Sequence, residues 1–385
     1  MDNNNRKIEC CAWLLWALSI IAISCLVAQN PVSHSVVPVY HNASDSWWAR
    51  DEIYIGSKGM NYLPHFTILF SPFHALGTPA GDILWRVVSV LCLAWSIRRL
   101  IAIVSPQSVS RDFLWSSCFA LPACLGAMRN GQANALFAAV TVLAVVLLME
   151  RRWKMAGAAM VLAIAIKPLG IVLALLAVFG YRRVILPLVV CTAVLLLLPF
   201  AFGPTEYVLA QYAGLVENLR TCSQAGVTRR FANLNGLLQE LSIELPGRSI
   251  RIMSLMGGFG TWVIWLIAGR RLDEPERGLL LVSLATVYLM LFNPMNESNS
   301  FVIIAPAIIA VAVRLRQVSN SQVWAWSLAC LLLSTWVLPE LLRSLDRDSQ
   351  TWWKPVAAIT FIGIVMARTH GLVRTNPRIA LSHES

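Results

Sequence analysis

Apolar runs of roughly 17 to 25 residues recur along the whole chain, and they restrict its fold more than any other feature. A run of about 20 apolar residues is long enough to cross a bilayer as an α-helix. Hydrophobic residues make up 57% of the 385 residues and charged residues only 13%, whereas about a quarter of a soluble domain is charged. The sequence therefore predicts an all-α, polytopic integral membrane protein that forms one domain over residues 1–385.

The expected membrane spans are about ten in number. They are 11–29, 80–97, 112–128, 132–149, 184–203, 251–269, 278–293, 300–314, 321–340 and 354–368. The first resembles a signal peptide, but it is close to 20 residues long and has no convincing small-residue cleavage site, so we expect an uncleaved helix. Two long loops, 30–64 and 204–250, and a tail, 369–385, complete the chain.

The apolar segment 155–180 needs a separate interpretation, because it lies between two basic stretches, ERRWK (150–154) and YRR (181–183). If both stretches lie on the same side, the segment enters the membrane and returns, with Lys167 and Pro168 near its turn. Each arm is then about a dozen residues long, which is short for a full span at 1.5 Å per residue. A re-entrant or tilted helical pair and a single kinked span both remain open.

The distribution of Lys and Arg predicts the orientation of the chain. With the N-terminus inside, the two basic stretches and the tail 369–385 are cytoplasmic, as the positive-inside rule requires. Loops 30–64 and 204–250 are then on the outer face of the plasma (inner) membrane. The net charge of +11 follows from this orientation, and we expect membrane lipids, not nucleic acid, as partners.

In this topology the unusual polar residues gather on the outer side. The turn between spans 112–128 and 132–149 carries four of them, and a later turn, LFNPMNESNSF, carries four more. These residues are Arg129, Asn130, Gln132, Asn134, Asn293, Asn296, Glu297 and Asn299. The loop 30–64 adds Asp45, Asp51 and Glu52, and Lys167 approaches from within the membrane. A Lys at the bilayer centre costs about 2.5–3.5 kcal/mol on insertion scales, so such groups usually face a protein interior or a wet cavity.

A purely structural interpretation of these polar residues is also open. Asn and Gln satisfy the free backbone groups at helix ends, and Lys167 would hydrogen-bond carbonyls that Pro168 leaves free. No His, Asp or Glu cluster has the spacing of metal ligands, and the nine cysteines form no CxxC pair. We therefore expect neither a metal nor a cofactor.

The stretch RNGQANALFAAVTVLAVVLLMERRWKMAGAAMVLAIAIKPLGIVLALLAVF resembles the hallmark stretch of glycosyltransferase family 87. The shared pattern is Gly-Gln-x-Asn, a span, a basic turn, an Ala-Gly helix start and a Lys in the next apolar segment. Upstream, Val39-Tyr40, Tyr62-Leu63-Pro64 and Pro72 look like the first outer loop of that family, and LFNPMNESNSFVIIAPA looks like its late loop. The resemblance covers most of residues 30 to 315.

The resemblance implies a GT-C fold and transfer of a sugar, mannose-like or another hexosyl or pentosyl unit, from a polyprenyl-phosphate donor. The acceptor would be a lipid or glycan hydroxyl at the outer face, and the anomeric centre would be inverted. One departure concerns the base: the family places an Asp shortly before the Val-Tyr, where this chain has HSVVP. The remaining candidates for the base are Asp51, Glu52, Asp45 and Glu297.

The resemblance also implies roles for the other polar residues. Arg129 and Lys167 would neutralise the donor phosphate, where negative charge accumulates as it leaves. Substrate-binding positions would be filled by Tyr62, Asn130, Gln132, Asn134, Asn293 and Asn299.

Two other classes of protein remain as alternatives. A secondary transporter would also gather polar residues at a broken segment such as Ala-Ile-Lys-Pro, but it would place them near mid-membrane and show an inverted repeat. The second alternative is a catalytically inactive, lipid- or glycan-binding protein on a GT-C scaffold, which the missing early Asp makes credible.

Overall fold

A computed structural model describes residues 3–54, 60–228, 230–317, 321–342, 344–346 and 348–375. In these ranges the chain forms sixteen α-helices, joined by short 3₁₀ segments, and no β-strand. Eight of the helices are long and apolar enough to cross a membrane. The predicted class, an all-α polytopic membrane protein, is therefore confirmed.

The centre of the bundle is formed by α6 (Asn134–Met149), α13 (Glu274–Phe292) and α14 (Ala305–Arg316). Their side chains are mostly small or branched aliphatic residues that are buried around the whole helix, which is the pattern of a helix enclosed on all sides. Around them lie five longer helices: α1 (Asn3–Gln29), α4 (Ala80–Val104), α5 (Val109–Asn130), α15 (Gln322–Leu342) and α16 (Ser349–Thr375).

Two helices on the periphery, α9 (Ile185–Leu197) and α12 (Gly247–Ala268), bury little of their apolar surface inside the protein. Large hydrophobic side chains such as Leu186, Leu197 and Leu255 are exposed on them. In a soluble protein such patches would be a liability, but in a bilayer they face lipid.

The predicted spans and the observed helices agree in order and approximate position. Segments 112–128 and 132–149 correspond to α5 and α6, which do not meet the length and composition of a candidate span. Fourteen of the sixteen residues of α6 are buried instead, between α4, α7 (Trp153–Ile166) and α13.

The segment 155–180 folds as a helical hairpin, the first of the two alternatives. Its arms are α7 and α8 (Ile171–Gly180), joined by a 3₁₀ turn over Pro168–Gly170. At the open end of the hairpin, opposite its turn, the rings of Trp153 and Tyr181 lie 6.1 Å apart. The two arms therefore begin and end on the same side. The hairpin turns closely at Gly170, where a Cβ atom would lie 2.7 Å from the backbone nitrogen of Ile164.

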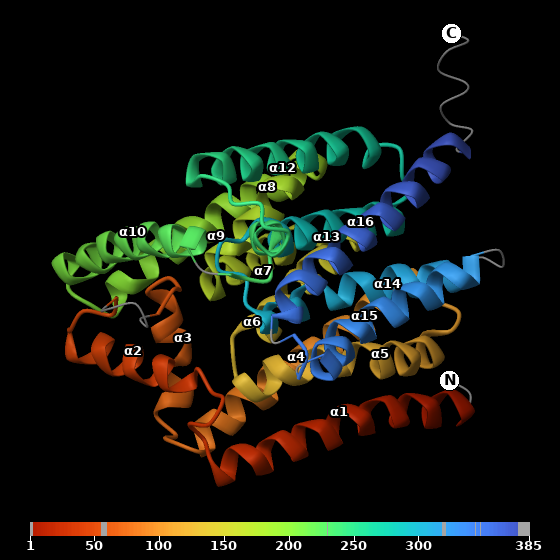
Figure 1. Cartoon of the computed structure of the whole chain (residues 1–385). Helices are drawn as coiled ribbons and strands as arrows, with labels where there is room; N and C mark the ends of the chain where they lie inside the picture. Colours follow the sequence, from red (N-terminus) through yellow and green to blue (C-terminus); the bar gives the residue numbers. More distant parts are fainter. Residues whose placement is uncertain are drawn as a thin grey trace.

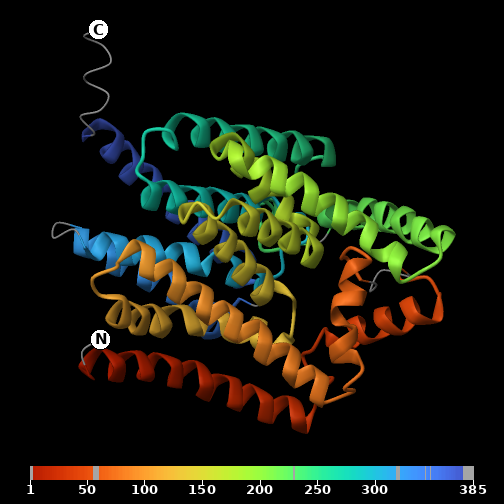
Figure 2. The same cartoon turned by 180° about the vertical axis from the view of Figure 1, so that it is seen from behind.

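Four further helices lie at one end of the bundle, which we name the loop end: α2 (Val37–Ala49), α3 (His65–His74), α10 (Thr205–Thr228) and α11 (Leu234–Glu240). Figures 1 and 2 show α2, α3 and α10 together at this end, whereas α1 begins and α16 ends at the opposite end. The long loops predicted at 30–64 and 204–250 thus contain helices. The predicted tail 369–385 begins inside α16, and its residues 376–385 lie outside the described part of the chain.

Ion pairs fasten the opposite end of the bundle. The buried carboxylate of Glu276 accepts from Arg314 at 2.8 Å and also from Arg368, so it joins α13, α14 and α16. Glu9 of α1 pairs with Arg98 of α4 at 2.6 Å. The opposite ends of α13, α14 and α16 lie next to the loop that contains Glu297.

Candidate active site

The turn between α5 and α6 is held in one conformation by Gly131. This residue has φ of +70°, which an L side chain rarely adopts, and a Cβ atom there would lie 2.5 Å from Val37. Arg86, buried on α4, donates to the carbonyl oxygens of Met128 at 3.2 Å and Arg129 at 3.0 Å. Its guanidinium therefore satisfies carbonyls at the end of α5 that have no partner within the helix.

Two tyrosines lie beside the residue that precedes α6. The hydroxyl oxygen of Tyr40 accepts from the backbone N–H of Ala133 at 3.1 Å and lies 3.1 Å from the hydroxyl of Tyr62. Burial raises the pKa of Tyr40 to about 12, and burial raises the pKa of Tyr62 well above its ordinary value. Both phenols therefore stay protonated at neutral pH and can donate hydrogen bonds.

A chain of amides and one carboxylate follows directly after this turn. The Asn134 side chain donates to the Gln132 side chain at 2.5 Å, and Gln132 in turn donates to the carboxylate of Glu297. Asn134 is fully buried, and its Nδ2 atom also lies 3.4 Å from the hydroxyl of Ser300. The two motifs that the sequence separates by 165 positions are thus in direct contact.

Lys167 reaches the same place from the tip of the hairpin. Because Pro168 disfavours helical backbone in the residue before it, α7 ends at Ile166 and Lys167 is extended, with φ −145° and ψ 131°. Its ammonium nitrogen lies 5.3 Å from the centre of the Tyr62 ring, and its charge interacts with that of Glu297. A cation and an anion thus face the same small volume.

The loop that carries Glu297 is fastened on both sides of that residue. Asn296 is buried, and its Nδ2 atom donates to the carbonyl oxygens of Ala232 at 2.7 Å and Met290 at 2.9 Å. Lys354 of α16 donates to the carbonyl oxygen of Ser298 at 2.9 Å. Between these anchors Glu297 itself is exposed, so its carboxylate is held in place but open to a ligand.

Five of the residues predicted for the site are brought together in this way. They are Tyr62, Gln132, Asn134, Lys167 and Glu297. They come from the loop before α3, the α5–α6 turn, the hairpin tip and the loop after α13.

The three other acids predicted as bases make different contacts. Asp45 is 66% exposed and lies 3.0 Å from Nε2 of His74. Asp51 and Glu52 are exposed after α2, where the backbone oxygen of Asp51 accepts from the hydroxyl of Tyr207 at 2.9 Å. No contact between these acids and the Gln132–Glu297 group is seen among the described residues, and their catalytic role stays a prediction.

The remaining predicted residues lie at the edges of the group. Arg129 is half-buried and binds Arg86 through its carbonyl oxygen, and Asn130 accepts from Val36 through its carbonyl oxygen at 3.0 Å. The Asn299 side chain lies over Gly126 of α5, where an added Cβ atom would be 2.7 Å from its Oδ1 atom. Asn293 ends α13, and its side-chain oxygen accepts from the backbone of Met295.

Three contributors were not predicted from the sequence as site residues. Tyr40 was noted only as part of a motif, and Ser300 carries no sequence signal beyond its place in the late loop. Arg86 did carry a signal, because an arginine within an expected span needs a partner in the protein. Its partners proved to be the carbonyls that shape the α5–α6 turn.

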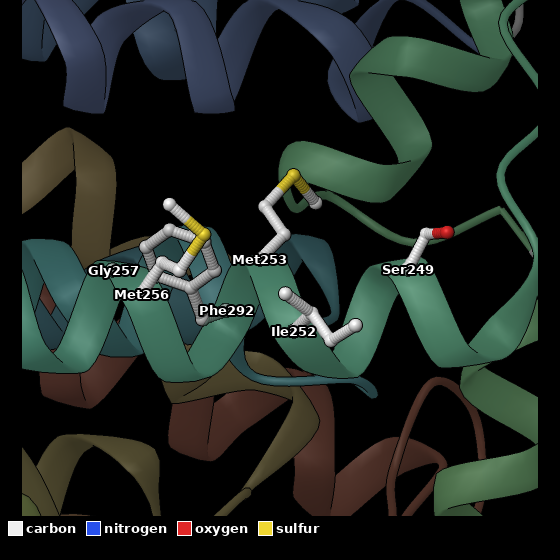
Figure 3. Close-up of a pocket in the computed structure, with 6 residues that line it drawn as sticks. All are labelled: Ser249, Ile252, Met253, Met256, Gly257 and Phe292. Atoms are coloured by element: carbon white, nitrogen blue, oxygen red, sulfur yellow. The ribbon is translucent and has the colours of Figure 1, made fainter.

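A cavity of about 560 Å³ lies between α12 and the end of α13, at the loop end of the bundle (Figure 3). Its lining is apolar except for the hydroxyl of Ser249. The lining residues are Ser249, Ile252, Met253, Met256, Gly257 and Phe292. Such a lining suits a hydrocarbon chain and offers no group for acid–base chemistry. Among the described residues, no group of three or more His, Cys, Asp or Glu side chains could hold a metal ion.

The sequence matches the family model of glycosyltransferase family 87 over residues 61–294, which is more than half of the chain. The chain therefore belongs to glycosyltransferase family 87 and is a membrane glycosyltransferase. Tyr62, Gln132, Asn134 and Lys167 lie within the matched residues, and Glu297 lies just beyond them. No curated protein matches the sequence.

Proposed function

We propose that this protein transfers a mannose-like or another hexosyl or pentosyl unit from a polyprenyl-phosphate donor to a lipid or glycan hydroxyl. The reaction would occur at the loop end of the bundle, on the outer face of the plasma membrane, and would invert the anomeric centre. The observation that carries the proposal is the contact of Gln132, Asn134 and Glu297 beside the cation Lys167.

Glu297 is the proposed base. Transfer to a hydroxyl requires a carboxylate that takes the proton as the new bond forms. Glu297 is exposed, yet Gln132 binds one of its oxygens and the neighbouring Asn296 and Ser298 are anchored. A base held in this manner meets an acceptor in a fixed position. Asp51 and Glu52 do not contact the amides among the described residues, and they are the alternative bases.

Lys167 is the proposed partner of the donor phosphate. The leaving phosphate gains negative charge in the transition state, and a fixed cation stabilises that charge most where water is scarce. Lys167 lies at the tip of a hairpin whose arms are apolar, so it has few competing partners apart from Glu297. Arg129, half-buried one turn before Gln132, would be a second cation at the rim.

The amides and Tyr62 would orient the sugar. Gln132 and Asn134 bind one another, and the Oδ1 atom of Asn134 is buried without a hydrogen-bond partner. An unsatisfied buried acceptor is costly, and a sugar hydroxyl would satisfy it. Asn130, Asn293 and Asn299 would contribute from the edges.

A lipid donor is supported by the position of the apolar cavity. It opens between α12 and α13 at the same end of the bundle as Glu297, and Met256 on its wall is 69% exposed. A polyprenyl chain in this groove would remain within the membrane while its phosphate lies at the loop end.

The test is transfer from radiolabelled polyprenyl-phosphate mannose, arabinofuranose and glucose by the full chain in nanodiscs, with a host lipid extract as acceptor. Three proteins are compared: the wild type, Glu297→Gln and the double variant Asp51→Asn/Glu52→Gln. Glutamine at 297 keeps an oxygen that can accept from Gln132 but loses the charge, so the loop should remain folded. We expect Glu297→Gln to lower kcat about 10²- to 10⁴-fold and the double variant to stay within a few-fold of wild type.

The opposite ranking would transfer the role of base to Asp51 or Glu52. Donor binding without turnover, given every acceptor fraction of the extract, would indicate a scaffold that has lost catalysis. Absence of binding to all three donors would contradict the proposed donor class.

A further inference from the structure

Two histidines at the loop end face one another through ring nitrogens. Nδ1 of His41 on α2 lies 2.9 Å from Nδ1 of His74 at the end of α3. Each ring is backed by a carboxylate: Nε2 of His41 lies 2.7 Å from Asp82 on α4, and Nε2 of His74 lies 3.0 Å from Asp45 on α2. The four side chains form one continuous line, from buried Asp82 to exposed Asp45.

Proton counting defines the charge state in which this line is fully hydrogen-bonded. An ionised carboxylate only accepts, so each Nε2 must carry a proton, and the Nδ1–Nδ1 contact needs one more. The two rings then carry three protons, one more than two neutral imidazoles. If this proton is absent, either the two Nδ1 lone pairs face one another or one ring turns its proton away from its carboxylate.

The charged groups that face the pair carry a net negative charge. The groups that face it are Asp45 on α2, Asp82 on α4 and Arg86, whose guanidinium donates to the carbonyl oxygen of Asp82 at 2.9 Å. Two anions and one cation leave a deficit of one positive charge, which a single proton on the pair supplies. A metal would need further ligands, because two ring nitrogens are only half of a tetrahedral set.

The pair joins the helix that carries Tyr40 to its neighbours. His41 follows Tyr40 directly in the sequence. The ring centroid of Phe70 on α3 lies 5.2 Å from that of His41 and 5.4 Å from that of Tyr40. Tyr40 in turn binds the backbone at the start of α6, next to Gln132. Whatever fastens α2 at His41 therefore also fixes the wall of the candidate site.

We propose that His41 and His74 share one proton, and that this proton fastens α2, and with it Tyr40, onto α3 and α4. The two histidines are positioning residues, and their effect has a sign. Histidine changes charge between about pH 5 and pH 8. The line of hydrogen bonds from Asp82 to Asp45 is therefore complete at the acidic end of that interval, and it loses one hydrogen bond as the pH rises.

The experiment uses the full-length chain in nanodiscs and needs no sugar transfer, so its result is independent of the proposed function. Nitrogen NMR of ¹⁵N-histidine protein is expected to show a coupling between two Nδ1 atoms across a hydrogen bond at about pH 6, absent near pH 8. Hydrogen exchange of α2, corrected for intrinsic rates, is expected to show a loss of protection of about tenfold or more over the same interval.

The decisive variant is His74→Asn. Its amide can donate permanently to Nδ1 of His41, so the contact should persist without an extra proton and the exchange of α2 should become independent of pH. His34→Asn is the matched control, because His34 is exposed, has φ of +55° and should leave the pH dependence unchanged. Two uncoupled Nδ1 signals in the wild type, or an unaltered pH dependence in His74→Asn, would overturn the proposal.

Discussion

Replacement of Gly131 by alanine tests whether the α5–α6 turn sets the geometry of the site. The substitution has two costs that the structure separates. An L residue at φ of +70° costs about 1–2 kcal/mol in the left-handed region. The new Cβ atom would also lie 2.5 Å from Val37 and 2.8 Å from the guanidinium of Arg86, and overpacking of this kind costs about 1–3 kcal/mol.

A matched substitution isolates the second cost. Gly77 has nearly the same φ, +67°, but nothing lies within 4 Å of the Cβ position. Gly77→Ala should therefore lower the free energy of unfolding by about 1–2 kcal/mol, and Gly131→Ala by about 2–5 kcal/mol. The entropy that alanine removes from the unfolded chain is common to both variants and cancels in their difference.

The assay is reversible unfolding in mixed micelles. The measured quantity is the difference in the free energy of unfolding between Gly131→Ala and Gly77→Ala. Sugar transfer by the folded fraction is measured in parallel, since displacement of Arg86 would also shift Gln132 and Asn134. Equal free energies of unfolding for the two variants would refute the close approach of Arg86 to this turn. Full activity of Gly131→Ala would refute its role in placing the amides.

Two further predictions concern single cations. Lys167→Met should lower kcat/KM for a polyprenyl-phosphate donor about 10- to 100-fold, because a charge-assisted contact to the phosphate is lost. Lys167→Arg keeps the charge and should recover part of this loss in kcat/KM. Equal rates for both variants would contradict the role of Lys167 as the cation at the donor phosphate. Arg86→Lys should lower the free energy of unfolding by about 1–3 kcal/mol, because an ammonium cannot replace the fork that binds the carbonyls of Met128 and Arg129. An Arg86→Lys protein as stable as wild type would mean that those carbonyls find other partners.

Much of the architecture could be predicted because the bilayer imposes it. Length and hydropathy located the membrane spans approximately, although they missed α2, α10 and α11 within the predicted loops. The basic ends of 155–180 made a segment that returns to its own side one of two alternatives. Pro168 also fixed, through local sterics alone, the extended residue at the hairpin tip. These inferences depend on interactions between a residue and its near neighbours or the solvent.

Which of the acids contacts the amides could not be predicted in the same way. Asp51 and Glu52 stand closer in sequence to the Val-Tyr motif than Glu297 does, and the resemblance to the family favoured them. The contact of Glu297 with Gln132 depends on how α5, α6 and α13 pack, and no local pattern records that packing. The contacts of His41 and His74 between α2, α3 and α4 could not be predicted for the same reason, because they depend on how these helices pack.

The sequence by itself determined the class of this protein, the order of its helices and the residue types available for chemistry, because membrane insertion and helix periodicity act locally along the chain. Only the tertiary structure decided which of those residues meet. It joined Lys167, Glu297 and the amides in one volume and left Asp51 and Glu52 at the surface. Contacts between residues more than a hundred positions apart depend on the packing of buried helices, whose nearly uniform aliphatic surfaces carry little information about their partners.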